Sequence, residues 1–157
     1  MKIGILTFHR ATNYGAILQA YALVSYLNSI GHDAKIIDYK PKGMGQLYAS
    51  VAVPGVVKKA KRIVLNILML RSLKARKAKR DMYWEYVSKV LPMTEPIIDE
   101  KDFPRLDIVL VGSDQVWSTC YTDGVDKFYW GQFDRKGAKL FSYAGSAAED
   151  MKGSFYT

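Results

Sequence analysis

The N-terminal stretch Lys2–Gly31 constrains the fold more than any other part of the chain. Residues 3–8 form a short apolar run without polar alternation, which is typical of a strand buried on both faces. An apolar stripe at helical spacing follows, and Gly31, which adopts positive φ without steric cost, ends it. A second apolar run at residues 34–39 completes a strand–helix–strand unit. The stripe consists of Ala16, Ala20, Leu23, Val24 and Leu27. We therefore expect an α/β fold with a Rossmann-like parallel sheet and flanking helices.

The loop between the first strand and the helix is the first place to look for chemistry. In parallel sheets, ligands bind beyond the carboxyl ends of the strands, and this loop runs from His9 to Gly15. It has neither the Gly-x-Gly-x-x-Gly of dinucleotide binders nor the Gly-Lys-Ser/Thr of a Walker phosphate loop. We expect His9 to be exposed or capped, and Asp38, at the end of the second strand, to face water.

Composition bounds the class of protein. The 157 residues suit one domain with a real core, and 49% hydrophobic residues argue against disorder. The single cysteine excludes an internal disulfide framework, and two scattered histidines offer no metal cluster. The apolar runs at residues 3–8 and 63–70 are too short for a signal peptide or a membrane span. We expect a cytoplasmic protein without a metal or other cofactor.

The net charge of +8 is concentrated in one region. Between residues 56 and 90 there are eleven Lys and Arg residues against two acidic ones, whereas the rest of the chain is nearly neutral. Residues 71–91 have a helical pattern, with Ala75, Ala78, Met82, Tyr86 and Val90 on one face and Pro92 at the end. We interpret residues 56–91 as a basic helical insertion. Its basic face is either solvated or meets an anionic lipid surface, and nucleic acid ranks last because no binding motif is present.

A second polar loop follows a third apolar run at Asp107–Val111. Gly112 permits a sharp turn there, and the next three residues offer a hydroxyl, a carboxylate and an amide. Either Ser113 or Asp114 caps a following helix, or these side chains bind a substrate. Aromatic residues at 128–130 are expected to pack beneath the next loop, and Lys139–Tyr143 is a fourth short strand.

The ordered set of these motifs resembles the polysaccharide pyruvyl transferase family. The resemblance implies the first domain of a two-domain, glycosyltransferase-B-like fold, and the chain matches only that first half. It rests on Thr7–Leu23 with its Asn-Tyr-Gly-Ala, on Ile36–Tyr39, on the Gly-Ser-Asp-Gln-Val-Trp of Val111–Trp117, and on Ser142–Ser146.

The resemblance also implies a reaction, in which a pyruvyl group passes from phosphoenolpyruvate to a sugar of a cell-surface glycan and forms a ketal. Such a protein would serve exopolysaccharide synthesis at the bacterial cell envelope, with a sugar or lipid-linked glycan as acceptor. Asp114 is the candidate catalytic residue, in contact with an acceptor hydroxyl. The candidate substrate-binding residues are Arg10, for the donor carboxylate, with Asn13, Tyr14, Gly15, Gly112, Ser113 and Gln115.

Two other functions stay open at this stage. A nucleotide-sugar glycosyltransferase would have a similar architecture, and a vestigial or purely binding half-domain would have no activity. Because only one wall of a two-domain cleft is expected here, we predict that residues 1–157 alone do not catalyse the transfer. An apolar face left without the second half would favour self-association or require that half as a partner.

The basic segment Lys58–Arg80 gives a first testable prediction. Each Lys or Arg near an anionic bilayer adds roughly 1 kcal/mol of attraction that falls with salt. The protein should therefore cosediment with vesicles containing anionic lipid and be released by salt, which would fit a peripheral position at the inner membrane face. Equal sedimentation with neutral and anionic vesicles would leave only the solvated interpretation.

Overall fold

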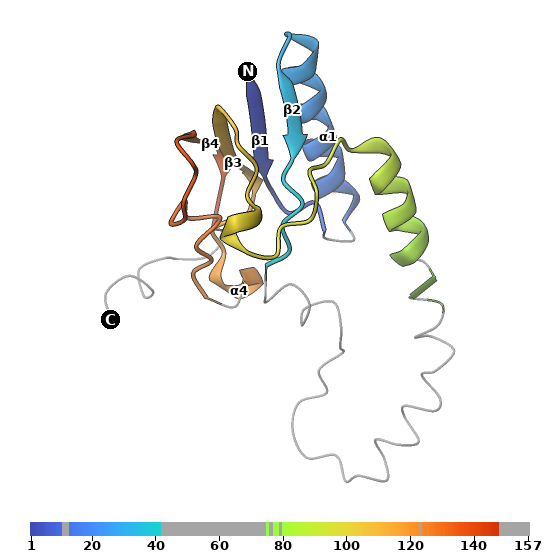
Figure 1. Ribbon diagram of the computed structural model, residues 1–157. Coiled ribbons are helices and arrows are strands. Elements are labelled where there is room, and N and C mark those ends of the chain that lie inside the picture. The colour runs from blue at the N-terminus through green and yellow to red at the C-terminus, as the bar shows by residue number, and fades with distance from the viewer. Residues whose placement is uncertain (11–12, 42–74, 76, 79, 123, 148–157) are drawn as a thin grey trace, which may run out of the picture.

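The computed structural model describes residues 1–10, 13–41, 75, 77–78, 80–122 and 124–147. Its centre is a four-stranded, all-parallel sheet in the order β2-β1-β3-β4 (Figure 1). The labelled elements are β1 Lys2–Leu6, α1 Tyr14–Ser29, β2 Asp33–Ile36, β3 Ile108–Asp114, α4 Thr119–Thr122 and β4 Lys139–Gly145. The predicted α/β fold, with a Rossmann-like parallel sheet and flanking helices, is confirmed.

Strand β1 lies at the centre of the sheet, and its sequence explains why. Ile3 is in register with Ala34 of β2 on one side and with Ile108 of β3 on the other. From Ile3 onward every residue of β1 is buried, which matches its unbroken apolar run. Since all strands are parallel, the loops that follow β1, β2 and β3 leave the sheet at one edge, here called the carboxyl edge.

One face of the sheet packs against two helices. The first is α1, which buries Ala16, Ile17, Ala20 and Val24 as its apolar stripe predicted. The second comprises residues 80–90 and lies beside α1 in Figure 1. Its buried side is formed by Tyr83 and Val87, and Leu91, directly after the helix, joins the same cluster.

The predicted face of this second helix is wrong by about a third of a turn. Met82 and Tyr86, which the sequence pattern placed on the apolar face, are 67% and 59% exposed. Tyr83 is chosen over Met82 because its ring packs on Tyr14 and its hydroxyl donates to the Asn13 carbonyl oxygen. The buried stripe packs into the core through Tyr83, Val87 and Leu91, and the long-range hydrogen bond of Tyr83 adds to that packing.

The other face of the sheet is covered by aromatic side chains from connecting segments. The Tyr39 and Phe128 rings have centroids 4.4 Å apart, and Phe8 meets Tyr129 edge-on at 5.2 Å. Phe103 is fully buried in the same cluster. The expectation that aromatics at 128–130 pack beneath their loop is confirmed for Phe128 and Tyr129.

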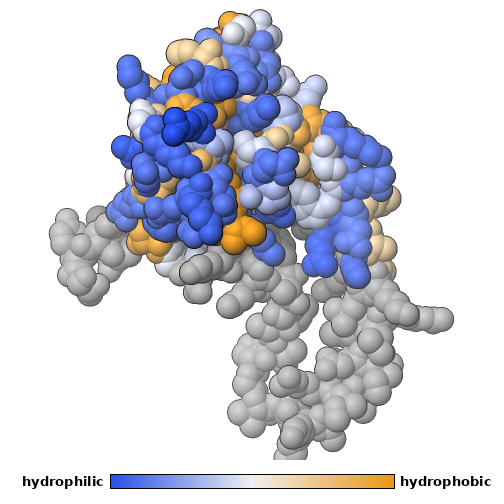
Figure 2. Space-filling view, in the orientation of Figure 1, coloured by the Kyte–Doolittle hydropathy of each residue, from blue (hydrophilic) through white to orange (hydrophobic). Residues whose placement is uncertain are grey.

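Strand β4 forms an edge of the sheet and is exposed along almost its whole length. Its largest exposed side chains are Phe141 and Tyr143, at 52% and 54%. Elsewhere the front of the molecule is mostly hydrophilic, with apolar patches between the charged groups (Figure 2).

The predicted basic insertion is described only in part. The helix is present from residue 80 to residue 90 and is followed by Pro92, as expected. Nearly all of Lys58–Arg80 lies outside the described residues, so the membrane hypothesis stays a prediction. Within the part of the chain that the structure describes, no helix is both long and apolar enough to cross a bilayer.

Gly112 gives a test of the packing between β3 and β4. It has a φ of 111°, and an added Cβ would collide with the Tyr143 carbonyl oxygen. Gly137 has a similar φ of 89° but open space around it. We predict that Gly137→Ala costs about 1 kcal/mol from backbone strain alone, whereas Gly112→Ala costs at least about 3 kcal/mol, measured by chemical denaturation. Equal losses for the two variants would contradict the collision.

Candidate active site at the carboxyl edge

The loops after β1 and β3 are tied together at the carboxyl edge. The Thr7 hydroxyl, directly after β1, donates to the Ser113 carbonyl oxygen near the end of β3 at 2.8 Å. The Thr7 carbonyl oxygen accepts a hydrogen bond from the His9 backbone N–H at 2.9 Å. Thr7 itself is only 1% exposed. The two predicted loops therefore form one continuous edge.

Asn13, Tyr14 and Gly15 begin α1 at this edge and are all exposed. Asn13 is the N-cap, and its side-chain oxygen accepts from the Gly15 N–H at 2.9 Å. This arrangement leaves the Asn13 amide NH₂ as the group that can meet a ligand. The cap explains why the helix begins here and why the Asn-Tyr-Gly sequence has a fixed shape.

Asp114 closes β3 in an unusual backbone conformation. Its φ is 94°, in a region that favours glycine, and its carboxylate Oδ1 accepts from the Gln115 N–H at 2.8 Å. Oδ2 accepts no hydrogen bond from the residues that the structure describes, and Ser113, Asp114 and Gln115 are all partly exposed. A non-glycine residue held in such a conformation is characteristic of functional sites.

The alternative in which Ser113 or Asp114 caps a following helix is wrong. Strand β3 continues through Asp114, and the next helix, α4, begins only at Thr119. The Asp114 carboxylate instead stabilises the turn directly after the strand. The Asp114 side chain therefore does not cap a helix.

A buried ionic cluster at the ends of β1 and β2 corrects two predictions. Asp38 does not face water but is 6% exposed, and His9 is fully buried. Asp38 Oδ1 lies 2.9 Å from His9 Nε2 and accepts from Arg10 Nε at 2.6 Å, while Oδ2 accepts from Arg10 Nη2 at 2.5 Å. Arg10 thus grips Asp38 with two parallel hydrogen bonds, a geometry that lysine cannot reproduce.

Helix 80–90 covers this cluster with Trp84. The Arg10 guanidinium carbon lies 5.1 Å from the centre of the indole, and the His9 ring meets the same indole edge-on at 6.3 Å. Trp84 is itself partly exposed, as is Arg10 at 28% of its side chain. The guanidinium is therefore fixed on one edge by Asp38 and on one side by an aromatic ring.

The charges in the cluster shift the titration of Asp38. Burial alone would raise the pKa of this carboxyl, but hydrogen bonds from His9 and Arg10, together with their charges, outweigh it and lower the pKa to about 2. Asp38 is therefore ionised throughout the physiological range.

A second buried network supports the edge from the aromatic side. The Tyr39 hydroxyl donates to Asp126 Oδ2 at 2.7 Å, and Asp126 Oδ1 accepts from the Phe128 N–H. Burial first, and then the Asp126 carboxylate, raises the pKa of Tyr39 well above its usual value. The Tyr129 hydroxyl reaches the Thr7 carbonyl oxygen at 3.4 Å. Thr7 is thus held from both sides of the sheet.

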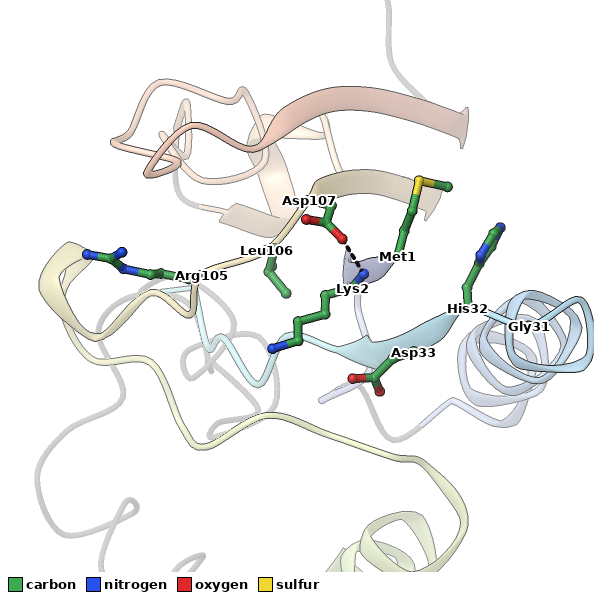
Figure 3. Close-up of a pocket in the computed structure, with 8 residues that line it drawn as sticks. All are labelled: Met1, Lys2, Gly31, His32, Asp33, Arg105, Leu106 and Asp107. Atoms are coloured by element: carbon green, nitrogen blue, oxygen red, sulfur yellow. Dashed lines mark hydrogen bonds between the residues drawn. The ribbon is translucent and has the colours of Figure 1, made fainter.

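A pocket of about 620 Å³ lies at the opposite, amino edge of the sheet. Figure 3 shows Lys2, Asp33 and Arg105 around it, with the Lys2 N–H donating to Asp107. The pocket is open, its charged groups are exposed, and none of the predicted site residues lines it. We therefore place the candidate site at the carboxyl edge, where parallel α/β sheets bind their ligands.

The family model for polysaccharide pyruvyl transferase matches residues 13–156. The chain belongs to the polysaccharide pyruvyl transferase family. No curated protein and no solved structure matches the chain.

In this pyruvyl transferase family member, seven of the eight predicted site residues lie within the matched range, from Asn13 to Gln115, and Arg10 precedes it. The structure brings the loops of Asn13 and Asp114 to one edge, whereas Arg10 is engaged by Asp38 on its Nε–Nη2 side. Their roles toward substrate remain predictions. Within the described residues, no group of three or more His, Cys, Asp and Glu side chains could hold a metal ion.

Sequence reasoning missed the buried pairing of His9 and Asp38. The two residues are 29 positions apart, and only the parallel pairing of β1 with β2 brings them together. A signal was present, because a His-Arg pair follows one strand and an Asp ends the next. Opposite charges at the carboxyl ends of neighbouring parallel strands indicate an ion pair.

The Asp38 carboxyl makes the free energy of unfolding depend on pH below about pH 4. Its pKa is about 2 in the folded protein and 3.8 without these contacts, so the contribution is complete above about pH 4 and is lost as pH falls toward 2. We predict that the difference in unfolding free energy between wild type and Asp38→Asn shrinks by about 2 kcal/mol over that window. Arg10→Gln, which removes two of the donors, should weaken the same pH dependence. A difference that stays constant across the window would rule out this account.

Proposed function

We propose that the carboxyl edge takes part in transfer of a pyruvyl group from phosphoenolpyruvate to two hydroxyls of one sugar residue in a cell-surface glycan. The observation that carries the proposal is the family match over residues 13–156, which spans the Asn13 and Asp114 loops. The polar groups of these loops, gathered at a single sheet edge, support it. A sugar or a lipid-linked glycan would be the acceptor, as in exopolysaccharide synthesis at a bacterial envelope.

The reaction defines what the site must supply. One sugar hydroxyl adds to the central carbon of the enol, whose methylene carbon takes up a proton and becomes a methyl group. The second hydroxyl then displaces the phosphate, and its proton leaves with inorganic phosphate. The site therefore needs a base near the acceptor hydroxyls, donors that orient the sugar, and cations for the anionic donor.

Asp114 suits the role of the base. Its Oδ1 is fixed by the Gln115 N–H, so Oδ2 is the oxygen that can accept a proton from a hydroxyl. The Asn13 amide and the Ser113 and Gln115 side chains would orient sugar oxygens, and the exposed Gly15 would allow close approach of the backbone. Gly112 is buried against the Tyr143 carbonyl oxygen, so its part would be to shape the turn that presents Ser113. The Tyr14 ring, which is 65% exposed, would offer an apolar face to the sugar.

Among the described residues, His9 is the other candidate for proton transfer beside Asp114. The His9 imidazole is fully buried, and both ring nitrogens lie against protein oxygens. It therefore cannot reach a substrate. For this reason we propose that residues 1–157 bind the donor without turning it over on their own, because one open wall leaves the contacts screened by water.

The main rival function is transfer of a sugar from a nucleotide sugar. The β1–α1 loop has no glycine pattern that would let the backbone approach a pyrophosphate, and its described residues include one Arg and the Asn13 side chain. These features favour a small anionic donor over a dinucleotide-like one. Competition between phosphoenolpyruvate and nucleotide sugars separates the two functions.

Donor and acceptor binding test the proposal directly. Two charge-assisted hydrogen bonds of about 2 kcal/mol each correspond to a Kd on the order of 1 mM, so phosphoenolpyruvate should bind in that range by NMR titration. Asp114→Asn removes a nearby negative charge and should leave donor binding unchanged or tighter, while weakening binding of β-galactoside and hexosamine acceptors about tenfold. Nucleotide sugars should not displace the donor.

The matched control is Asp107→Asn, because Asp107 lies at the amino edge and should affect neither ligand. Turnover of labelled phosphoenolpyruvate by residues 1–157 would refute the claim of inactivity alone. Displacement of the donor by a nucleotide sugar, or binding of a nucleotide sugar in its place, would favour the glycosyltransferase and count against pyruvyl transfer.

A further inference from the structure

The His9–Asp38–Arg10 cluster carries an inference that the family match does not. His9 and Arg10 lie before the matched range, and no role toward substrate follows from it for Asp38. Three charged or titratable side chains meet there, two of them buried, at the edge where the Asn13 and Asp114 loops converge. Such an arrangement costs stability unless the groups are fully paired.

The ring of His9 has an acceptor on each side. Its Nδ1 lies 3.1 Å from the Thr7 carbonyl oxygen, which can only accept. Its Nε2 lies 2.9 Å from Asp38 Oδ1. The ionised Asp38 carboxylate has no proton to donate, so this oxygen acts only as an acceptor. Either neutral tautomer would place a bare nitrogen lone pair against an oxygen. Both contacts are hydrogen bonds at the same time only when both nitrogens donate, as they do in an imidazolium.

Arg10 is held in a way that leaves one edge of its guanidinium free. The Nε–Nη2 edge is taken by Asp38, and one flat side rests near Trp84. Among the residues that the structure describes, Nη1 has no hydrogen-bond partner, and the side chain keeps 28% of its surface exposed. The Nη1–Nη2 edge can form paired hydrogen bonds with carboxylate or phosphate oxygens, as the Nε–Nη2 edge does with Asp38.

We propose that His9 and Asp38 are positioning residues that fix Arg10 as an oxyanion-binding group at the carboxyl edge. The His9 imidazolium donates a hydrogen bond to Asp38 Oδ1 and so fixes the orientation of the carboxylate. The Asp38 carboxylate in turn fixes the guanidinium of Arg10. With two positive groups and one negative group, the cluster keeps a net charge of +1. The inference rests on the proposed function, because it names the contact for the anionic donor.

Positioning explains why a carboxylate stands beside an anion site. Asp38 reduces the local positive charge, which on its own weakens attraction for an anion. Asp38 also restricts the rotamers of the Arg10 side chain before any ligand is present. Less side-chain entropy is then lost on binding, so the preorganised guanidinium binds an anion more tightly. The two effects have opposite signs, so removal of the Asp38 charge reveals which one dominates.

The charge of His9 is tested first and without any ligand. In protein labelled with ¹⁵N, the two ring nitrogens of His9 should both give imidazolium signals at neutral pH. His32, which is partly exposed at the amino edge, provides the comparison within the same spectrum. A spectrum with one protonated and one bare nitrogen in His9 would overturn the proposal.

The oxyanion contact is tested by titrating the Arg10 Nε–H signal with phosphoenolpyruvate, with pyruvate and with inorganic phosphate. All residues 1–157 are used, and Arg105, at the amino edge, is the matched control. The Arg10 signal should move and that of Arg105 should not. A response to pyruvate but not to phosphate identifies the carboxylate as the bound group, and the reverse identifies the phosphate.

Two variants decide whether Asp38 positions Arg10. Asp38→Asn should weaken phosphoenolpyruvate binding about tenfold, the loss of roughly one charge-assisted hydrogen bond. Arg10→Lys keeps the charge but loses the fork, and should weaken binding similarly. If Asp38→Asn does not fold, judged by its amide spectrum, Arg10→Lys alone decides. Tighter binding in Asp38→Asn, or unchanged binding in Arg10→Lys, would overturn the proposal.

Failure of this inference differs from failure of the proposed function. Phosphoenolpyruvate that binds while the Arg10 signal stays fixed refutes the inference and leaves pyruvyl transfer standing. An Arg10 signal that moves with phosphate or pyruvate, when phosphoenolpyruvate itself does not bind, supports an oxyanion site and counts against pyruvyl transfer. If none of the three ligands binds, both the inference and the proposed function are refuted.

Discussion

The carboxylate of Asp38 is the interaction on which the edge of this sheet depends. It accepts hydrogen bonds from His9 and Arg10 while almost fully buried, and so it joins the end of β2 to the loop after β1. Breaking a buried pair leaves an uncompensated charge and costs several kcal/mol, so the loop cannot easily adopt another shape. A buried ion pair can therefore be costly to break even where its net contribution to stability is small.

Thr7 transmits that fixed geometry to the second loop. Its carbonyl oxygen accepts from His9 and Tyr129, and its hydroxyl donates to the Ser113 carbonyl oxygen. Asp114 follows directly, in a backbone conformation that side chains rarely adopt. A chain of hydrogen bonds thus runs from the ion pair to the candidate base, and the aromatic layer beneath it excludes water. Preorganisation of this kind is what a site for ordered proton transfer requires.

Local sequence patterns predicted the framework well, because each strand is a short apolar run and parallel pairing follows from the helix between β1 and β2. The same patterns located Asn13 and Asp114 at one edge, since parallel strands end together. Sequence patterns failed where contacts between residues far apart in the chain determine the structure. The partner of Asp38 comes from another strand, and the buried face of helix 80–90 is set by contacts of Tyr83 with Tyr14 and Asn13. Neither contact is visible in a window of neighbouring residues.

The most direct test of the account is a crystal structure of the protein with phosphoenolpyruvate bound. The account predicts that the ligand lies at the carboxyl edge, with an oxyanion on the free edge of Arg10 and its central carbon on the side of Asp114. The Asp38 ion pair should be unchanged in that complex. A ligand bound at the amino edge, near Lys2 and Arg105, or an Arg10 that leaves Asp38 to reach the ligand, would contradict it.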